Sequence, residues 1–317
     1  MLLPMRLSPW LRWCAVLFLL MRLASSACSA QELTPKRLSE HVWIFEGASA
    51  LGTRENRNFI SNAGLIIGPE GAVLVDALGS PAAARAALAA IRRLTDKPLT
   101  HVILTHYHAD HVYGLQVFKA AGARIVAHQL GREYLYSATA AQRLQASIEE
   151  GLVEAGTQLV AADQWIDGET KLHVAGLDLL LLPVGPAHTR EDLAVWLASD
   201  KLIFAGDLVF SRRVPYVGEA DSAHWIASLD QLLAWPARII VPGHGPASTE
   251  AQADLLQTRD YLAYLRATMG RAAREMTDFD AAYAATDWSR FEALPLFKAA
   301  NRKNAYNTYL LMESQEK

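Results

Sequence analysis

Cysteine is almost absent from the sequence. Cys14 and Cys28 are the only two among 317 residues, and both lie in the first 30. The rest of the chain therefore has no thiol with which to form an internal disulfide or to bind a metal ion as a thiolate. Disulfide-stapled folds and cysteine-based zinc sites are excluded for residues 31–317.

An excess of charge of one sign is missing too. The chain has 30 basic and 33 acidic residues, a formal net charge of −3, so there is no electrostatic reason to expect a nucleic-acid partner. Internal repeats and low-complexity tracts are also missing, although alanine is abundant. With 51% hydrophobic residues, the chain can bury a full-sized core.

A hydrophobic run long enough to span a bilayer is also lacking at the N-terminus. Trp13 to Met21 is apolar but too short for that purpose. Arg6 and Arg12 precede this run, and small residues follow it from Ala24 to Ala30. The pattern predicts a signal peptide over residues 1–30.

The end of this segment leaves the mode of export open. Cleavage near Ala27 or Ala30 would release a periplasmic or secreted protein, which is the preferred interpretation. A membrane anchor is the alternative, although Arg22 follows the apolar run directly. Cys28 is a candidate for lipid attachment, but Ser25 stands where bacterial lipoprotein signals usually carry an aliphatic residue. Membrane association is therefore expected only if Cys28 is lipidated.

The most informative stretch runs from Thr105 to His111 and reads Thr-His-Tyr-His-Ala-Asp-His. It follows a short apolar run with β-branched residues, which predicts a buried strand. His106 and His108 are two residues apart, so in extended chain they point to the same side. Asp110 and His111 come where the chain turns. One turn thus offers ligands for two neighbouring metal ions.

Three further polar residues stand at comparable places later in the chain. His188, Asp207 and His244 each follow a predicted apolar strand and lie in a turn of small residues. An open α/β layer places ligands along one edge of its sheets in this way. The pattern therefore predicts one polar site assembled from four strand ends.

This His-x-His-x-Asp-His turn, with the later His, Asp and His, resembles the metallo-β-lactamase superfamily of hydrolases over roughly residues 38–250. The resemblance implies an α/β fold, a four-layer αββα sandwich, with Asp76 supporting the metal site from behind its ligands. It also implies a first zinc on three histidines, a second zinc on three further residues, and one bridging carboxylate. In that order these residues are His106, His108 and His188, then Asp110, His111 and His244, and Asp207 as the bridge.

After His244 the chain changes character. The predicted organisation is a hydrolase domain over residues 31–250 and a helical C-terminal extension over 251–317, packed on the core. The ending Asn301-Arg302-Lys303-Asn304-Ala305-Tyr306 resembles exported zinc hydrolases that accompany quinoprotein and sulfur-oxidation systems. A periplasmic quinoprotein system is therefore a candidate partner, and ordinary packing is the alternative reading of the motif.

The expected chemistry follows from the ligand types. Imidazoles and carboxylates without thiolates suit two Zn²⁺ ions, and iron or manganese is also compatible with these donors. Zinc lowers the pKa of bound water from about 15.7 to about 7, which provides hydroxide at neutral pH. The expected reaction is hydrolysis of an ester, thioester, amide or lactam bond in a small molecule. Asp110 is the expected catalytic residue, because it would both ligate a metal ion and orient the nucleophile.

A β-lactam substrate is a separate question. The run Gly185 to Asp192 resembles class B β-lactamases locally. In those with a zinc-binding cysteine, a lysine three residues later holds the substrate carboxylate, and Phe210 stands at that place here. The amide side chain expected near Tyr216 is also missing, and Arg212 or Arg213 is a candidate replacement for the lysine. A generic periplasmic zinc hydrolase therefore ranks ahead of a class B β-lactamase.

Two further classes stay open. A glyoxalase-type thioesterase or an iron-dependent sulfur dioxygenase would use the same ligands, although an exported location is less natural for glutathione thioesters. A metal-containing, non-catalytic accessory protein of a quinoprotein or sulfur-oxidation system is the non-enzymatic alternative. Metal content and turnover on a substrate panel would separate these classes.

Several helices are predicted outside the motif. Ser80 and Pro81 open an Ala-rich helix to about Leu94, with serine as the N-cap. A helix is expected from His111 to about Ala121, a helical insertion over 129–156, and a helix capped by Ser222.

The remaining expectations concern a strand, a loop and the other histidines. Trp165 to Val174 is predicted to form one sheet segment, and the polar loop 47–58 is the candidate substrate flap. None of the other histidines has a partner at ligand spacing, although His128 lies just past a strand end. These histidines, expected to be core or surface residues, are His41, His101, His128, His173 and His224.

Overall fold

The structure is a computed structural model that describes residues 33–218 and 220–315. The predicted signal peptide over residues 1–30 lies outside the described residues. From Thr34 onward the chain forms one compact unit. Among the described helices, none combines the length and hydrophobicity that crossing a bilayer would require.

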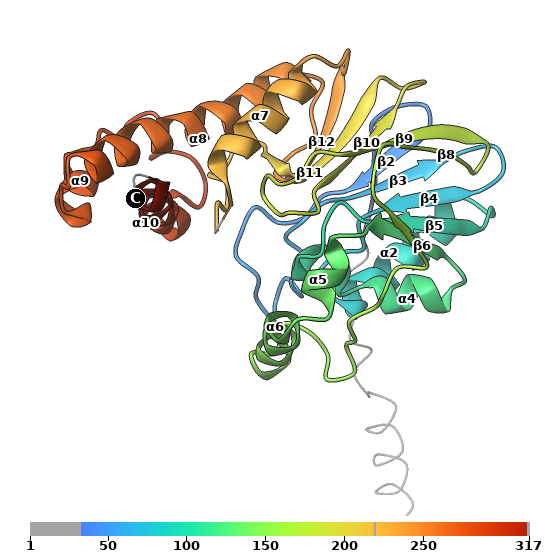
Figure 1. Ribbon diagram of the computed structural model, residues 1–317. Helices are drawn as coiled ribbons and strands as arrows, with labels where there is room; N and C mark the ends of the chain where they lie inside the picture. The colour runs from blue at the N-terminus through green and yellow to red at the C-terminus, as the bar shows by residue number, and fades with distance from the viewer. Residues whose placement is uncertain (1–32, 219, 316–317) are drawn as a thin grey trace, which may run out of the picture. The chain divides into compact units, whose positions relative to one another are not determined.

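Two β-sheets form the centre of this unit (Figure 1). The first has seven strands in chain order: β1 (Lys36–Arg37), β2 (Val42–Phe45), β3 (Ala63–Ile67), β4 (Ala72–Val75), β5 (Leu99–Ile103), β6 (Arg124–His128) and β7 (Gln164–Ile166). The second has five, in the order β12 (Ile239–His244), β11 (Leu202–Phe210), β10 (Leu193–Leu197), β9 (Leu177–Pro183) and β8 (Thr170–Val174). Strands β4 to β7 are parallel, and so are β11 and β12.

Helices cover the outer face of each sheet. On the first sheet these are α2 (Pro81–Leu94) and α4 (Leu115–Ala120), and on the second α7 (Ser222–Leu233) and α8 (Ala251–Arg274). One apolar cluster fills the space between the sheets, and a second lies between the five-stranded sheet and the C-terminal helices. The predicted four-layer αββα sandwich is confirmed.

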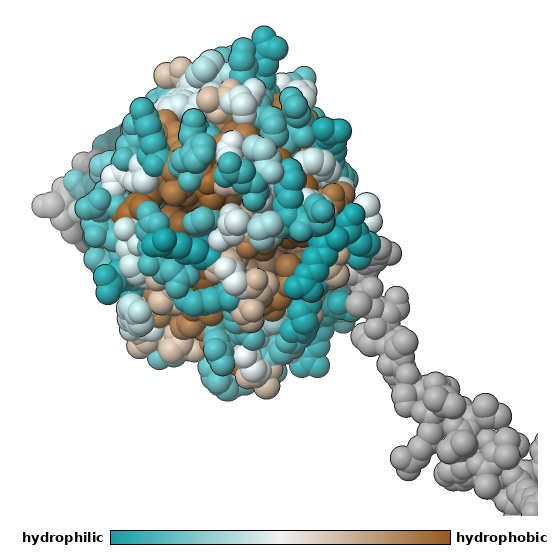
Figure 2. Space-filling model, turned by 90° about the vertical axis from the view of Figure 1, so that its right-hand side faces the viewer, coloured by the Kyte–Doolittle hydropathy of each residue, from teal (hydrophilic) through white to brown (hydrophobic). Residues whose placement is uncertain are grey.

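Apolar residues are concentrated in the interior, and the surface visible in Figure 2 is largely hydrophilic. The strands β4, β10 and β11 are buried along their whole length, as expected for strands covered on both faces. On the face shown in Figure 2, hydrophobic residues are visible only in separate areas between hydrophilic ones.

The insertion and the C-terminal extension contribute four more helices to the described part of the chain. The expected helical insertion is present as α5 (Gly131–Leu135) and α6 (Ala138–Glu149). At the C-terminal end, α9 (Phe279–Ala285) and α10 (Phe297–Gln315) follow α8, and α10 packs along α8. The division into domains at residue 250 stays a prediction.

Helix α2 is confirmed, whereas two other expected helix details are wrong. The hydroxyl of Ser80 accepts a hydrogen bond from Ala83 N–H at 3.2 Å, as an N-cap does. The helix expected from His111 to Ala121 is broken into α3 (Ala109–Val112) and α4. The break comes at Gly114, where a Cβ would lie 1.9 Å from the Ala77 carbonyl oxygen.

The other corrections concern a cap and a strand. Helix α7 is capped by Asp221, whose carboxylate accepts from Ala223 N–H, and Ser222 is its first residue. The segment Trp165 to Val174 is not one strand, because β7 belongs to the first sheet and β8 to the second. The chain crosses between the sheets at the intervening turn, which the alternation of residues did not reveal.

Candidate metal centre

The Thr105 to His111 turn leaves the end of β5 and enters the short helix α3. His108 stands at the N-cap of α3, and Asp110 and His111 lie within the helix. Asp76 holds the start of the turn, because its carboxylate accepts from the Thr105 N–H at 2.8 Å and from the Thr105 hydroxyl. The turn therefore has little freedom to move its polar side chains.

The other three residues come from the second sheet. His188 lies in the turn after β9, as expected, whereas His244, also expected in a turn, is the last residue of β12. The turn expected at Asp207 is wrong, because β11 continues to Phe210 and holds Asp207 inside the strand. The pairing register shifts at Gly206, which has a positive φ of 51°, so a bulge turns the strand locally at the aspartate.

The structure brings all seven predicted residues together. They form two groups in which each residue offers one ligand atom, with all ligand atoms of a group within 4.8 Å of one another. The first group is His106, His108, His188 and Asp207, and the second is Asp110, His111 and His244.

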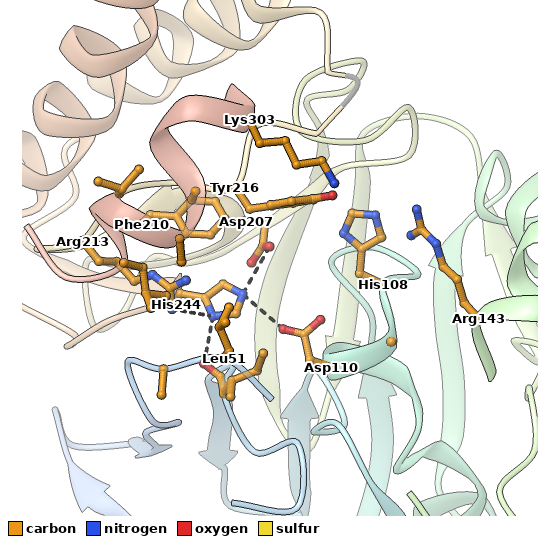
Figure 3. A pocket seen from close by; sticks show the side chains of 17 residues that line it. Leu51, His108, Asp110, Arg143, Asp207, Phe210, Arg213, Tyr216, His244 and Lys303 are labelled. Atoms are coloured by element: carbon orange, nitrogen blue, oxygen red, sulfur yellow. Dashed lines mark hydrogen bonds and ion pairs between the residues drawn. The ribbon is translucent and has the colours of Figure 1, made fainter. Parts of the chain in front are cut away.

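Asp207 faces both groups. Its Oδ2 atom lies 3.3 Å from His188 Nε2 in the first group and 3.3 Å from His244 Nε2 in the second. Its Oδ1 atom lies 3.1 Å from His111 Nε2. On the far side of the second group, Asp110 Oδ2 lies 3.2 Å from His244 Nε2 (Figure 3). A carboxylate in this position can contact two cations at once.

These residues fit divalent metal ions. His106 Nε2, His111 Nε2 and Asp207 Oδ1 are buried and make no well-directed hydrogen bond among the described residues, although the last two lie 3.1 Å apart. Leaving such atoms unpaired is costly unless something binds them. A donor set of imidazole nitrogens and carboxylate oxygens without sulfur suits zinc, and also iron or manganese.

In the first group, burial keeps the imidazoles neutral. It lowers the pKa of His106 well below its usual value, that of His108 to about 3 and that of His188 to about 4. Neighbouring histidines add to the effect, and Asp207 opposes it. Neutral imidazole is the form that binds a metal ion.

In the second group, the effect of the carboxylates on the histidine pKa values is larger than the effect of burial. Burial alone would lower the pKa of both histidines, but Asp207 and Asp110 outweigh it, raising that of His111 well above its usual value and that of His244 to about 9. Burial also opposes ionisation of the two carboxyl groups, yet the imidazoles hold their pKa values below the usual range. Without metal, protonated imidazoles supply the positive charge.

Hydrogen bonds behind the ligands fix the ring orientations. His111 Nδ1 donates to Asp76 Oδ2 at 2.9 Å, which confirms that Asp76 supports the site from behind. His244 Nδ1 donates to the Ile60 carbonyl oxygen at 2.8 Å. In each ring, Nε2 is left to face the other group members.

The family model of the metallo-beta-lactamase superfamily matches residues 56–244, which is more than half of the chain. The chain belongs to this superfamily. It is accordingly a member of a hydrolase superfamily, and it carries a His/Asp cluster that could hold metal ions.

Curated relatives in the superfamily include two kinds of enzyme. A linear primary-alkylsulfatase of Pseudomonas sp. (strain ATCC 19151) is 25% identical over 238 residues, with 63% of this chain and 45% of that protein covered. A metallo-beta-lactamase type 2 of Bacillus cereus is 26% identical over 231 residues, with 71% and 81% covered. The chain thus spans less than half the length of the alkylsulfatase.

Solved structures agree on the fold. The metallo-beta-lactamase from Pontibacter korlensis has a TM-score of 0.58 at 24% identity, covering 73% of this chain and 99% of that one. The inverting sec-alkylsulfatase Pisa1 from Pseudomonas sp. has a TM-score of 0.70 at 18% identity, covering 88% and 50%. The second match extends over most of the described chain.

A cavity of about 370 Å³ opens beside the metal-binding cluster of this superfamily member. Phe210 and Arg213 line it, whereas Arg212 does not. Arg213 is 6% exposed, and its Nη1 lies 3.4 Å from His244 Nδ1. Of the two candidate replacements for the β-lactamase lysine, only Arg213 therefore reaches the cavity.

Two cationic residues in this cavity had no role assigned from the sequence. Arg143 comes from the insertion helix α6, and Lys303 comes from α10 (Figure 3). Lys303 belongs to the motif from Asn301 to Tyr306, which from the sequence is linked only to a candidate partner. No sequence pattern connects Lys303 or Arg143 to the turn that carries the metal ligands. Leu51, from the expected flap loop, also lines the cavity.

The remaining histidines lie apart from the cluster. His41, His173 and His224 pair with neighbouring aspartates. His101 contacts the Thr100 hydroxyl. His128 is buried at the end of β6 and is not among the residues that line the cavity.

Proposed function

We propose that the chain is a binuclear zinc-dependent hydrolase that cleaves an ester, thioester, amide or lactam bond. The observation that carries this proposal is the pair of ligand groups joined through Asp207 at the edge of a cavity. His106, His108 and His188 would hold one ion and Asp110, His111 and His244 the other. Lactonase, thioesterase and lactamase chemistry would share this site.

When bound, the two ions supply a nucleophile at neutral pH and polarise the bond that is cleaved. The chain's own residues would orient the attacking group and exclude water. Asp110, 3.2 Å from His244, points into the cavity and would orient the attacking group by accepting its proton in a hydrogen bond. Leu51 and Phe210 would exclude water from the substrate.

Asp110→Ala tests this proposal. Turnover of a chromogenic ester and a chromogenic cephalosporin should fall by at least about 10³-fold, because both the ligand and the orienting group are lost. Metal analysis should find two zinc ions in the wild type. Chelator should remove the wild-type activity, and zinc should restore it. Full activity in a folded variant would refute the role, and metal without turnover on any substrate would favour an accessory protein.

A β-lactam is the second candidate substrate. The metallo-beta-lactamase type 2 relatives favour it, and Arg213 supplies a cation inside the cavity. Phe210 at the expected lysine position argues against it, and arginine does not replace lysine without a change of geometry. Chromogenic cephalosporin turnover lost in Arg213→Met, with ester turnover kept, would support the β-lactam.

Export and partnership are proposed on the sequence alone. We infer that the protein is periplasmic or secreted after cleavage near residue 30, and that a periplasmic quinoprotein system is its partner. N-terminal sequencing of the protein from a periplasmic extract tests the first point. A start upstream of Ala27 would contradict it, and a lipid on Cys28 would place the protein at a membrane.

A further inference from the structure

Helix α10 reaches the metal-binding cavity through Lys303. Lys303 lines this cavity, and it also lines a second hollow of about 550 Å³ beside it. His108, Arg143 and Tyr216 line both hollows as well. A ligand that extends from the metal ligands into either hollow therefore passes these four side chains.

Lys303 is exposed and has no carboxylate within ion-pair distance among the residues that the structure describes. Its Nζ atom lies 5.6 Å from the centre of the Tyr216 ring. The aromatic face attracts the ammonium group without neutralising it. The charge is thus directed at the cavity and remains available to a ligand.

Arg143 presents a second such charge from α6. Its guanidinium lies 5.8 Å from the centre of the Tyr134 ring, and no described acidic residue pairs with it. In Figure 3, Lys303 and Arg143 lie on opposite sides of His108. The two cations therefore face a common space next to one of the metal ligands.

Other exposed arginines close to this space are paired. Arg190 lies 2.5 Å from Glu133, and Arg302, the residue before Lys303, pairs with Asp280. Lys303 and Arg143 differ from these two arginines, because no described carboxylate lies within ion-pair distance of them. Cations left without partners around a concave site attract anionic ligands.

The arrangement of α10 also fixes the other wall of this space. Asn304 donates to the Pro215 carbonyl oxygen at 2.7 Å and accepts from Val217 N–H at 3.0 Å. Asn307 donates to the Gly218 carbonyl oxygen at 2.6 Å. The segment that carries Tyr216 is therefore attached to the helix that carries Lys303.

We propose that Lys303 and Arg143 bind the anionic group of the substrate, a carboxylate or a sulfo group, while the bond to be cleaved lies at the metal ligands. This proposal rests on the proposed hydrolase function. Phe210 stands where some class B β-lactamases carry a lysine that binds the substrate carboxylate. In this proposal Lys303, which lies on α10, takes over that role. The apolar part of the substrate would contact Leu51 and Val214, which line the same cavity.

A matched pair of esters tests this assignment. The butyrate and the glutarate monoester of 4-nitrophenol share a leaving group and differ in a terminal carboxylate. With metal-loaded protein, Lys303→Met and Arg143→Met should each lower kcat/KM for the glutarate ester by about tenfold, as expected for one lost charge-assisted hydrogen bond. The butyrate ester should change by less than about twofold under the same argument.

Lys298→Met is the matched control, because Lys298 is an exposed lysine of the same helix that does not line either hollow. It should leave both esters unchanged. A 4-sulfobutanoate ester of the same phenol distinguishes the two anions, since the ester that loses more in Lys303→Met carries the preferred group. Equal losses on neutral and anionic esters, or no loss at all, would overturn the proposal.

A binding measurement separates this proposal from the hydrolase function. If the wild type cleaves none of the esters, calorimetric titration of metal-loaded protein with 4-phenylbutyrate and with its neutral amide still reports on the anion site. Lys303→Met should weaken binding of the carboxylate by about tenfold and leave the amide unchanged. Carboxylate binding that is indifferent to both variants would overturn the anion site.

Discussion

The ring of Phe210 stacks on the imidazole of His244, with ring centroids 5.0 Å apart and planes inclined by 8°. Phe210 is fully buried, and it follows Asp207 by three residues on β11. Phe210, at the position of the lysine in some class B β-lactamases, thus packs against the imidazole of His244. It has no charge with which to bind a substrate carboxylate.

Phe210→Leu should therefore weaken the second metal group. Loss of the stacked ring frees His244 to tilt, and we expect the affinity for the second zinc to fall by about tenfold. Competition with a fluorescent chelator measures this affinity. Phe204→Leu is the control, because Phe204 is buried in the core between the sheets. Equal zinc affinities in the two variants would contradict the role of the stacking.

Asp76→Asn should lower the affinity for the second zinc by about 10- to 100-fold. The Asp76 carboxylate accepts hydrogen bonds from His111 Nδ1 and from Thr105, so the substitution removes the charge that orients the imidazole. Asp200→Asn is the matched control, because Asp200 accepts from His41 Nδ1 at 2.8 Å, away from the cluster. Both variants lose one His–Asp contact, and only the first should release zinc in the chelator assay.

The pH dependence of the metal-free protein follows from the opposed shifts in the two groups. The pKa of His244 is raised to about 9, since carboxylates outweigh burial. Its proton therefore stabilises the fold fully below its ordinary pKa of 6.5, and that stabilisation is lost as the pH rises towards about 9.

Burial lowers the pKa of His108 to about 3 and that of His188 to about 4. Below pH 6.5 these two histidines bind protons in the unfolded chain but stay neutral in the folded protein. The free energy of unfolding therefore also falls as the pH drops. Chelator-treated protein should accordingly be most stable near pH 6.5, as urea unfolding over about pH 5 to 9 would show. A steady rise in stability up to pH 9 would contradict the charge state assigned to His244.

Sequence reasoning located the seven cluster residues because each lies in a recognisable motif at or near the end of an apolar strand. The geometry at Asp207 was less accessible. The bulge at Gly206 keeps the aspartate inside β11, and only the pairing with β12 reveals this. The break at Gly114 likewise depends on how closely that residue approaches Ala77, a contact between segments far apart in sequence.

The cationic side of the cavity was out of reach for the same physical reason. Arg143 and Lys303 are 160 positions apart in the sequence, and each looks like an ordinary exposed residue of a polar helix. Their relation to the metal ligands arises from the packing of α10 along α8 and over the segment with Tyr216. The spacing of apolar residues along a helix indicates which face is buried. It does not indicate which cavity the exposed face lines.

Asn304→Ala should both destabilise the protein and reduce activity. Asn304 is 1% exposed, and besides Pro215 and Val217 its side chain contacts the Tyr261 hydroxyl at 3.0 Å. Its removal leaves these buried groups unpaired, which costs about 1–3 kcal/mol in the free energy of unfolding. It also removes two of the hydrogen bonds that attach the segment with Tyr216 to α10.

Asn307→Ala offers the comparison, because Asn307 is half-buried and its side chain makes one hydrogen bond among the described residues, to Gly218. Its loss should cost less than about 1 kcal/mol, since water can replace the missing donor. Urea unfolding measures both costs, and ester kinetics at a temperature where both variants are folded measures the effect on the site. If α10 positions the cavity wall, KM for an anionic ester rises more in Asn304→Ala than in Asn307→Ala. If α10 only adds stability, KM stays the same in both variants while their unfolding free energies differ.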